Sequence, residues 1–478
     1  MEIHVSLIDR THLGAEVYRQ LRQAIVDGRL RPGDRLPASR ELARRLGVSR
    51  TTVTVAYDRL AGEGFVTSRV GAGTFVSHHA GRTATTSRGD GRPREGGALR
   101  PRPDWTSVPL PSAFDRPARF DFRTGLPDVA LFPHDAWRRL MGRALRAGAR
   151  AAGVYAHPAG HRALREAIAR HVGLARAVRA TADDVTVTSG TQQALDVVAR
   201  VLLAPGDRVA VEDPGYAPPR RLFTSLGARV QGVPVDGEGL VVDALPRHTR
   251  LVYVTPSHQY PLGVPMSLAR RLALLDWAER HDAAIVEDDY DSEFRFHGRP
   301  IEPLQTLDRS GRVIYVGSFS KTLLPTLRLG FLVTPPSLRG AVHRAKYVTD
   351  WHTAIPAQAA LARFIDEGGF ARHVRRMNAV YRARHDLVTG TLARCFADQL
   401  EVVPSAAGLH VAALARPAVA QRMAAVVQRA SEAGVEVHDL TRFAVEGAGR
   451  AGLVLGYGAI PTADVEEGLR RLRACFDD

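Results

Sequence analysis

Lysine is scarce in this chain of 478 residues. Of its 65 basic residues, 63 are arginine, and only Lys321 and Lys346 are lysine. Codon usage in a GC-rich genome explains most of that ratio without any functional cause. The shortage still has a consequence, because chemistry that needs a lysine amine has only two candidates in this chain.

Cysteine and long apolar runs are also scarce. The two cysteines, Cys395 and Cys475, exclude a disulfide framework and a cysteine-rich zinc site, so we expect a reducing cytoplasm and no metal site. The segment Met1 to Arg10 has no apolar core of a signal peptide. No apolar run reaches about 18 residues, which argues against a membrane-spanning segment.

Positive charge, in contrast, is abundant. The formal net charge is +15. The hydrophobic fraction of 45% and the charged fraction of 24% are typical of a globular protein. Residues 1–76 contain 12 arginines against 8 acidic residues, and residues 77–119 contain 8 against 4. A nucleic acid would therefore bind most plausibly near the N-terminus.

Composition divides the chain into three zones. Residues 1–76 show alternating helical patterns that end in a glycine-rich strand pair. Residues 77–119 are rich in Gly, Pro, Ser, Thr and Arg, which predicts a flexible basic linker. Residues 120–478 repeat strand, turn and helix, a pattern typical of a parallel α/β sheet.

The first zone predicts three helices and a hairpin. An apolar stripe predicts a helix over residues 14–27. Ser39 is predicted to cap a second helix over 40–46, which Gly47 ends, and Ser49 to cap a third from 50 to about 61. Residues 64–68 and 74–76 form the predicted hairpin. The expected inward positions are Val17, Leu21, Ala24, Ile25, Val53, Ala56, Tyr57 and Leu60.

Two helices joined by a short glycine-containing turn are typical of a helix-turn-helix, whose second helix enters the major groove with its first turn. The strings Leu36–Ala43, Gly47–Val53 and Gly71–Val76 resemble the winged helix of GntR-type bacterial transcription regulators, over about residues 10–77. The resemblance implies binding to a double-stranded promoter operator. The implied contacts are Arg40, Ser49, Arg50, Thr51, Thr52 and Gly71.

Two motifs in the third zone are weak on their own. In Val185–Leu195 a strand enters a Ser-Gly-Thr turn that opens a helix, and the free N–H groups there suit a phosphate. In Glu212–Tyr216 an aromatic residue stands at a loop tip and could stack on a flat ligand. Many strand-to-helix turns contain glycine, and on its own Tyr216 is better explained as an ordinary turn tyrosine.

A third motif carries acids at the end of a buried strand. Asp288 and Tyr290 share one strand face, because side chains alternate along a strand. A carboxylate there could hold a pyridinium nitrogen protonated, and a phenol could hydrogen-bond a ring oxygen. Asp289 points to the opposite face and is predicted to be structural.

A fourth motif, Val313–Gly330, contains one of the two lysines. A buried strand ends in Ser318-Phe319-Ser320-Lys321, and Arg328 follows. A desolvated lysine forms Schiff bases, and arginine with serine hydroxyls binds phosphate. Lys346 lies in a basic helical pattern and is predicted to be a surface residue.

Together the four motifs resemble the pyridoxal 5′-phosphate (PLP) site of an α/β fold-type-I aminotransferase, over about residues 120–478. The resemblance implies that Lys321 is the Schiff-base lysine, Asp288 the pyridinium partner, Tyr290 the O3′ partner and Tyr216 the stacking ring. Because we expect a regulator without physiological turnover, we predict no catalytic residue beyond this Schiff-base lysine. The expected phosphate contacts are Gly190, Thr191, Gln192, Ser318, Ser320, Arg328 and, donated across a homodimer interface, Tyr155.

A GntR-like domain linked to an aminotransferase-like domain resembles the MocR subfamily of bacterial regulators, as does the string Thr255–Gly263. The resemblance implies an α+β winged helix at 1–76, a linker at 77–119 long enough to exchange heads between subunits, and an effector domain at 120–478. It implies a cytoplasmic, nucleoid-associated, DNA-binding homodimer that senses PLP or a PLP adduct with an amino compound. Vitamin B6 synthesis genes are among the expected targets.

Two positions depart from the aminotransferase pattern. Tyr260 stands where such enzymes usually carry an asparagine, and Val454 where many carry the arginine that clamps the substrate carboxylate. Arg450 could substitute for that arginine. The departures favour a regulator that senses PLP. A GABA-like or taurine-like effector remains an alternative, as does an aminotransferase with an accessory DNA-binding head.

Overall fold

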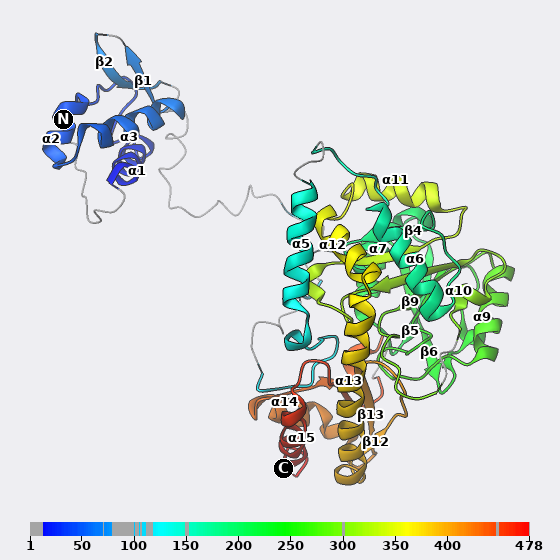
Figure 1. Cartoon of the computed structure of the whole chain (residues 1–478). Helices are drawn as coiled ribbons and strands as arrows, with labels where there is room; N and C mark the ends of the chain where they lie inside the picture. Colours follow the sequence, from blue (N-terminus) through cyan, green and yellow to red (C-terminus); the bar gives the residue numbers. More distant parts are fainter. Residues whose placement is uncertain are drawn as a thin grey trace. The chain divides into compact units, whose positions relative to one another are not determined.

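The computed structural model describes residues 13–69, 71–78, 100, 105, 108–110, 118–148, 153–298, 302–445 and 449–477. The chain divides into two compact units, Met1–Arg102 and Pro103–Asp478 (Figure 1). Most of the predicted linker, 77–119, lies outside the described residues.

The N-terminal unit contains the predicted helices and hairpin. The helices are α1 (Leu13–Val26), α2 (Ser39–Leu46) and α3 (Arg50–Gly62), and β1 (Val66–Arg69) pairs antiparallel with β2 (Gly73–Val76). The predicted inward residues of α1 and α3 are all buried in one cluster. The boundaries differ from the predicted ones by one or two residues.

One of the two predicted helix caps is wrong. The Ser49 hydroxyl accepts the backbone N–H of Thr52 at 3.0 Å and so caps α3 as predicted. Ser39, however, is the first residue of α2. Ala38 takes the cap position, where its side chain can accept no hydrogen bond. Gly47 ends α2 in the left-handed conformation, at φ 65°.

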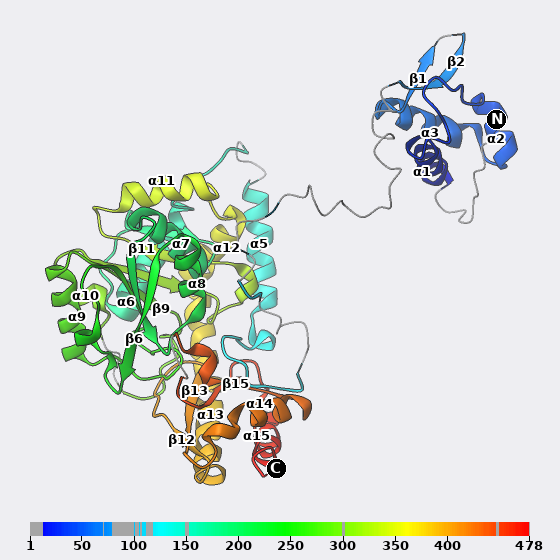
Figure 2. The ribbon, with the colours of Figure 1, turned by 180° about the vertical axis from the view of Figure 1, so that it is seen from behind.

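An eight-stranded sheet forms the centre of the second unit (Figure 2). Its strand order is β4-β11-β10-β9-β8-β5-β6-β7. Strand β11 runs antiparallel to both neighbours, β7 runs antiparallel to β6, and the other neighbouring pairs are parallel. The strands are β4 (Val185–Thr188), β5 (Arg208–Asp213), β6 (Arg229–Asp236), β7 (Gly239–Leu240), β8 (Thr249–Val254), β9 (Ala284–Asp289), β10 (Val313–Ser318) and β11 (Gly330–Val333).

Helices cover both faces of this sheet. The adjacent residues Ile285 and Val286 of β9 belong to two different apolar clusters, as expected for a strand buried on both sides. The cluster of Val286 includes α7 (Thr191–Leu202), α8 (Ala217–Ser225) and α11 (Arg339–Thr349), and that of Ile285 includes α9 (Leu268–Arg280) and α10 (Leu304–Leu307). A third cluster joins α5 (His134–Gly148), α6 (Arg162–Arg176) and α12 (Ile355–Asp366) to β4 and β11.

The long helix α13 (Gly369–Cys395) leads into a smaller C-terminal part (Figure 1). Its four-stranded antiparallel sheet has the order β12-β13-β16-β15, and helices α14 (Met423–Glu432) and α15 (Val465–Ala474) accompany it. The strands are β12 (Leu400–Val402), β13 (His410–Ala415), β15 (His438–Asp439) and β16 (Gly452–Gly456), while β14 (Val435–Glu436) pairs with β3 (Phe120–Asp121). Among the described residues, no helix has the length and apolarity needed to span a bilayer.

Candidate functional site

The strand register brings the motifs of the third zone together. Thr188 of β4 lies opposite Gly330, and Gly330 lies opposite Ser318 of β10. Asp288 of β9 lies opposite Val316 of the same β10. The carboxyl ends of β4, β9 and β10 therefore meet at one edge of the sheet, where open α/β folds bind their ligands.

Lys321 lies just beyond β10 at this edge. Its Nζ donates a hydrogen bond to the carbonyl oxygen of Gly125, at 2.7 Å. Burial lowers the pKa of Lys321, and the carboxyls of Asp291 and Asp288 act in the opposite direction. The amine is therefore less basic than a solvated lysine, which favours the nucleophilic neutral form.

Asp288 is 3% exposed and makes one hydrogen bond. The Tyr253 hydroxyl donates to its Oδ2 at 2.7 Å, while its buried Oδ1 has no partner among the described residues. Burial raises the pKa of Asp288 to about 7. An unpartnered buried carboxyl oxygen is costly unless a ligand donor reaches it, so this side chain fits an N–H group.

Tyr253 was not among the residues predicted from the sequence. It occupies β8, the neighbour of β9, and lies opposite Val286. A strand tyrosine in a sequence more often belongs to the core, so only the register identifies it as the partner of Asp288.

Tyr290 contacts a buried histidine. Its hydroxyl donates to the carbonyl oxygen of His258 at 2.9 Å and lies 3.0 Å from His258 Nδ1. The same imidazole lies 3.0 Å from Asp291 Oδ2 and 3.0 Å from Ser405 Oγ. His258 belongs to the string that supported the MocR resemblance, but the sequence assigned no role to it.

Asp289 points to the face of β9 opposite to that of Asp288, as predicted. Its Oδ2 accepts hydrogen bonds from Arg176 at 2.9 Å and from the Tyr315 hydroxyl at 2.6 Å. Burial alone would raise the pKa of Asp289, but Arg176 and Tyr315 bring it below its usual value. Asp289 is thus an ionised carboxylate that joins α6 to β9 and β10.

The turn after β4 forms a cradle with Arg328. Gly190 precedes α7 at φ 79°, without a side-chain cap, and a Cβ placed on it would lie 3.1 Å from the Arg328 guanidinium. Arg328 donates to the carbonyl oxygen of Ser189 at 2.6 Å. Free N–H groups at a helix start and an adjacent guanidinium suit a phosphate.

Four further predicted phosphate contacts, Thr191, Gln192, Ser318 and Ser320, lie at the start of α7 and at the end of β10. Thr191 is the first residue of α7, and Gln192 is exposed beside it. Ser318 is the last residue of β10, and its Oγ accepts the N–H of Ser320 at 3.0 Å.

Lys346 is not a surface residue, so that prediction is wrong. Its side chain is fully buried and donates to Asp350 Oδ1 at 2.5 Å. Val342, one turn earlier on α11, is buried as well, which shows that Lys346 lies on the packed face of an otherwise basic helix. Thr353 Oγ1 lies 3.5 Å from Lys346 Nζ and 3.2 Å from Ser189 Oγ. The second lysine is thus connected through Thr353 to the turn after β4.

Two aromatic candidates lie in different settings. Tyr216 precedes α8, and its ring centroid lies 5.4 Å from that of Tyr260, with the planes at 79°. Tyr155 is 72% exposed and stacks on Trp351 at 4.2 Å. Tyr216 thus contacts another aromatic residue of the site, Tyr260, whereas Tyr155 lies on an exposed surface.

The position of the aminotransferase arginine is apolar here. Val454 is fully buried in β16, between Ala412 and His438 of the adjacent strands. His438 Nδ1 lies 3.1 Å from Thr124 Oγ1, and burial lowers the pKa of His438 to about 4, so this histidine is neutral at pH 7. Arg450 is exposed ahead of the strand.

The predicted DNA contacts all lie on the N-terminal unit. Arg40 is exposed on α2, Arg50 and Thr51 are exposed at the start of α3, and Gly71 is exposed between the hairpin strands. The cap residue Ser49 and Thr52 complete the first turn of α3.

Comparisons with known families agree with this division. Residues 13–76 match the family described as "Bacterial regulatory proteins, gntR family", and residues 127–472 match "Aminotransferase class I and II".

Similar proteins include regulators and enzymes. The probable rhizopine catabolism regulatory protein MocR of Rhizobium meliloti is 39% identical, over 96% of this chain and 93% of its own length. The pyridoxine biosynthesis transcriptional regulator PdxR of Corynebacterium glutamicum is 32% identical, over 94% and 92%. The α-aminoadipate aminotransferase LysN of Thermus thermophilus, solved with N-(5′-phosphopyridoxyl)-L-leucine, superposes with a TM-score of 0.68 and 30% identity, over 75% of this chain and 92% of LysN.

Proposed function

The chain belongs to the MocR-type transcriptional regulators, in which a GntR-family DNA-binding domain is joined to an aminotransferase-like domain, and from this premise we propose that it controls a promoter in response to PLP. The cytoplasm of a bacterium is the proposed location. Operator binding is assigned to Arg40, Ser49, Arg50, Thr51, Thr52 and Gly71.

The observation that carries the proposal is that Lys321 and Asp288 are both buried at one edge of the sheet, close enough for the Asp288 carboxyl to affect the pKa of Lys321. Asp288 has one unpartnered buried oxygen, which suits the protonated ring nitrogen of PLP. Lys321 offers an amine of lowered pKa for the aldehyde. The cradle of Gly190 and Arg328 suits the phosphate.

When bound, PLP supplies an aldehyde that reacts with amines and a pyridine ring that withdraws electrons. The protein's own groups orient it. Asp288 keeps a carboxyl oxygen available for the ring nitrogen, and Tyr253 holds that carboxyl in place. Tyr290, fixed by His258, is assigned to the ring oxygen, and Tyr216 to the ring face.

We assign no physiological turnover to this site. Transamination requires the substrate carboxylate to be held, and an arginine clamp supplies much of that positioning. Here the corresponding position is the buried Val454, and the nearby His438 is neutral. A buried valine in place of the clamping arginine favours PLP itself over an amino acid as the effector, in line with the relative named for pyridoxine biosynthesis.

The regulator is proposed to act as a homodimer. Tyr155 and Trp351 stack, and the Tyr347 ring lies 4.7 Å from that of Trp351. Val154, Tyr155 and Val348 are 78%, 72% and 74% exposed. Such an aromatic and aliphatic surface is typical of an interface, and it contains the tyrosine assigned to the partner's phosphate.

Two assays on the purified full-length protein test the proposal. A gel-shift assay with the gene's own upstream region should show specific binding whose affinity or pattern changes with micromolar PLP, because a ligand shifts a regulator only through differential affinity. The second assay incubates the PLP-loaded protein with glutamate or alanine and a 2-oxo acid. Sustained multiple-turnover transamination, with DNA binding indifferent to PLP, would favour the enzyme alternative.

A further inference from the structure

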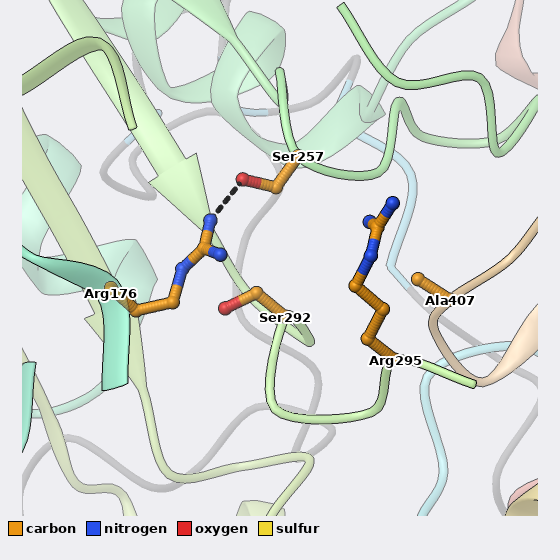
Figure 3. Close-up of a pocket in the computed structure, with 5 residues that line it drawn as sticks. All are labelled: Arg176, Ser257, Ser292, Arg295 and Ala407. Carbon is orange, nitrogen blue, oxygen red and sulfur yellow. Dashed lines mark hydrogen bonds between the residues drawn. The ribbon is translucent and has the colours of Figure 1, made fainter. Parts of the chain in front are cut away.

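A small pocket lies on the side of β9 that faces away from Lys321. It is lined by Arg176, Ser257, Ser292, Arg295 and Ala407. Figure 3 shows the two guanidinium groups on opposite sides of the pocket, with both serine side chains between them. Nothing in the proposed PLP site uses this pocket.

The arginines of the pocket are unequally paired. Arg176 donates to Asp289 at 2.9 Å and to Ser257 Oγ at 2.7 Å, so its charge is balanced. Arg295 forms no ion pair with any acid among the described residues, and its buried Nε has no hydrogen-bond partner there. An unpaired buried donor on a charged group is costly.

A third arginine adds to the positive charge. The fully buried Arg271 lies 3.7 Å from Glu287, and its pKa is lowered by burial and by the nearby charges of Arg176 and Arg295. Burial raises the pKa of Glu287 to about 7, so this acid is only partly ionised at neutral pH. Arg176 pairs with Asp289 and Arg271 with Glu287, so Arg295 is the guanidinium of this group that has no ion-pair partner among the described residues.

The size of the pocket restricts what could balance this charge. Its free volume is about 10 Å³. That is room for about one water molecule or one single-atom ion, and too little for a tetrahedral phosphate.

We propose that the pocket between Arg176 and Arg295 binds one halide ion, chloride under ordinary conditions. The ion would accept from the free Nε of Arg295 and offset the surplus charge, while Asp289 continues to balance Arg176. The proposal depends on the charges of this pocket and not on PLP binding.

The position of the pocket links it to the ligand site. Ser257 precedes His258, Ser292 follows Asp291, and Ala407 precedes Gly408. Arg295 and Ala407 also form a backbone bridge. A bound halide would therefore brace the three segments that hold His258 against Tyr290.

Bromide can replace chloride in such a site, and its anomalous X-ray scattering identifies it in a crystal. Crystals of the full-length protein grown in sodium bromide should give an anomalous difference peak between Arg176 and Arg295 at the bromine edge. A pocket that holds only water, or no ordered atom, under these conditions overturns the proposal.

Arg295→Gln tests the same site in solution, with Arg375→Gln as the matched control, since Arg375 is exposed on α13. Replacing gluconate by bromide at constant ionic strength should raise the melting temperature of the wild type saturably, by about 3 °C at roughly 100-fold the Kd. R375Q should keep this shift and R295Q should lose it. An equal shift in all three proteins contradicts the proposal, and if R295Q does not fold, the bromide crystals decide.

Discussion

The hydroxyl of Tyr253 donates to Asp288 Oδ2 at 2.7 Å, and the buried Asp288 Oδ1 has no partner among the described residues. One oxygen of this carboxyl is thus held by the protein and the other is left for a ligand. The tyrosine hydrogen bond lowers the pKa of Asp288 but does not offset burial, which brings that pKa to about 7. In the ligand-free protein, Asp288 therefore gains or loses its proton near neutral pH.

PLP affinity should consequently fall as the pH drops below 7. A pyridinium partner must be ionised, so PLP binding releases the proton that Asp288 carries in the ligand-free protein at low pH. Each pH unit below the raised pKa should weaken binding by up to about tenfold, or about 1.4 kcal/mol. Fluorescence titration of the apoprotein with PLP between pH 5.5 and 8 measures this slope, the change in PLP affinity per pH unit.

Asp288→Asn is the control for that slope. It keeps the shape of the side chain but cannot ionise, so PLP should bind weakly and with little pH dependence over the same range. Tyr253→Phe should keep the dependence of PLP affinity on pH but move it to higher pH. The pKa of Asp288 rises in this variant, because the hydrogen bond that favours the carboxylate is lost. A full slope in the asparagine variant would remove Asp288 from the ring-nitrogen position.

The two lysines should behave differently when PLP is added. Lys321→Ala should abolish the visible absorbance of bound PLP, because no other amine lies at the end of β10 in the described part of the chain. Lys346→Met should keep that absorbance and lower stability modestly, since its partner Asp350 has a side chain that is 31% exposed and can be solvated. Absorbance that survives in K321A and vanishes in K346M would transfer the role to the buried second lysine.

The sequence predicted those elements whose determinants are local. The helix and hairpin boundaries of the first unit follow from apolar spacing and from Ser49 and Gly47, all of which act within one turn. Alternation along β9 likewise separated Asp288 from Asp289. Ser39 was misplaced because a serine one residue past the cap position presents the same local pattern.

What the sequence missed depends on the register between distant segments. Tyr253 reaches Asp288 only because β8 and β9 are neighbours, and Ser405 reaches His258 across 147 positions of the chain. Lys346 was misjudged because charge composition does not reveal which face of a helix packs. Arg295 gave no signal at all, since a lone arginine in a sequence is usually solvated.

Arg50→Ala should weaken sequence-specific operator binding in a gel-shift assay by roughly ten- to a hundredfold. Arg50 is exposed at the first turn of α3, where a guanidinium can contact guanine O6 and N7, and losing one such contact costs about 1–3 kcal/mol of discrimination. Arg29→Ala is the control, because Arg29 is exposed in the loop after α1 and pairs with Asp27. Retained discrimination in R50A, or an equal loss in R29A, would contradict the placement of α3 in the groove.

Gly408→Ala should lower the free energy of unfolding far more than an ordinary glycine replacement. It should also disturb the contacts of Tyr290 with His258. Gly408 has φ +86°, and a Cβ there would overlap the His258 ring and the Asp291 carboxylate. Gly434→Ala is the matched control, since Gly434 has φ +77° and open space around it, so it reports backbone strain alone, about 1–2 kcal/mol. Urea unfolding should give G408A an extra loss of about 2 kcal/mol or more, because the overlapping groups must move.

PLP affinity should also fall in G408A alone, because His258 fixes Tyr290. Equal losses of stability in the two variants, with unchanged PLP affinity, would show that His258 can shift without disturbing Tyr290.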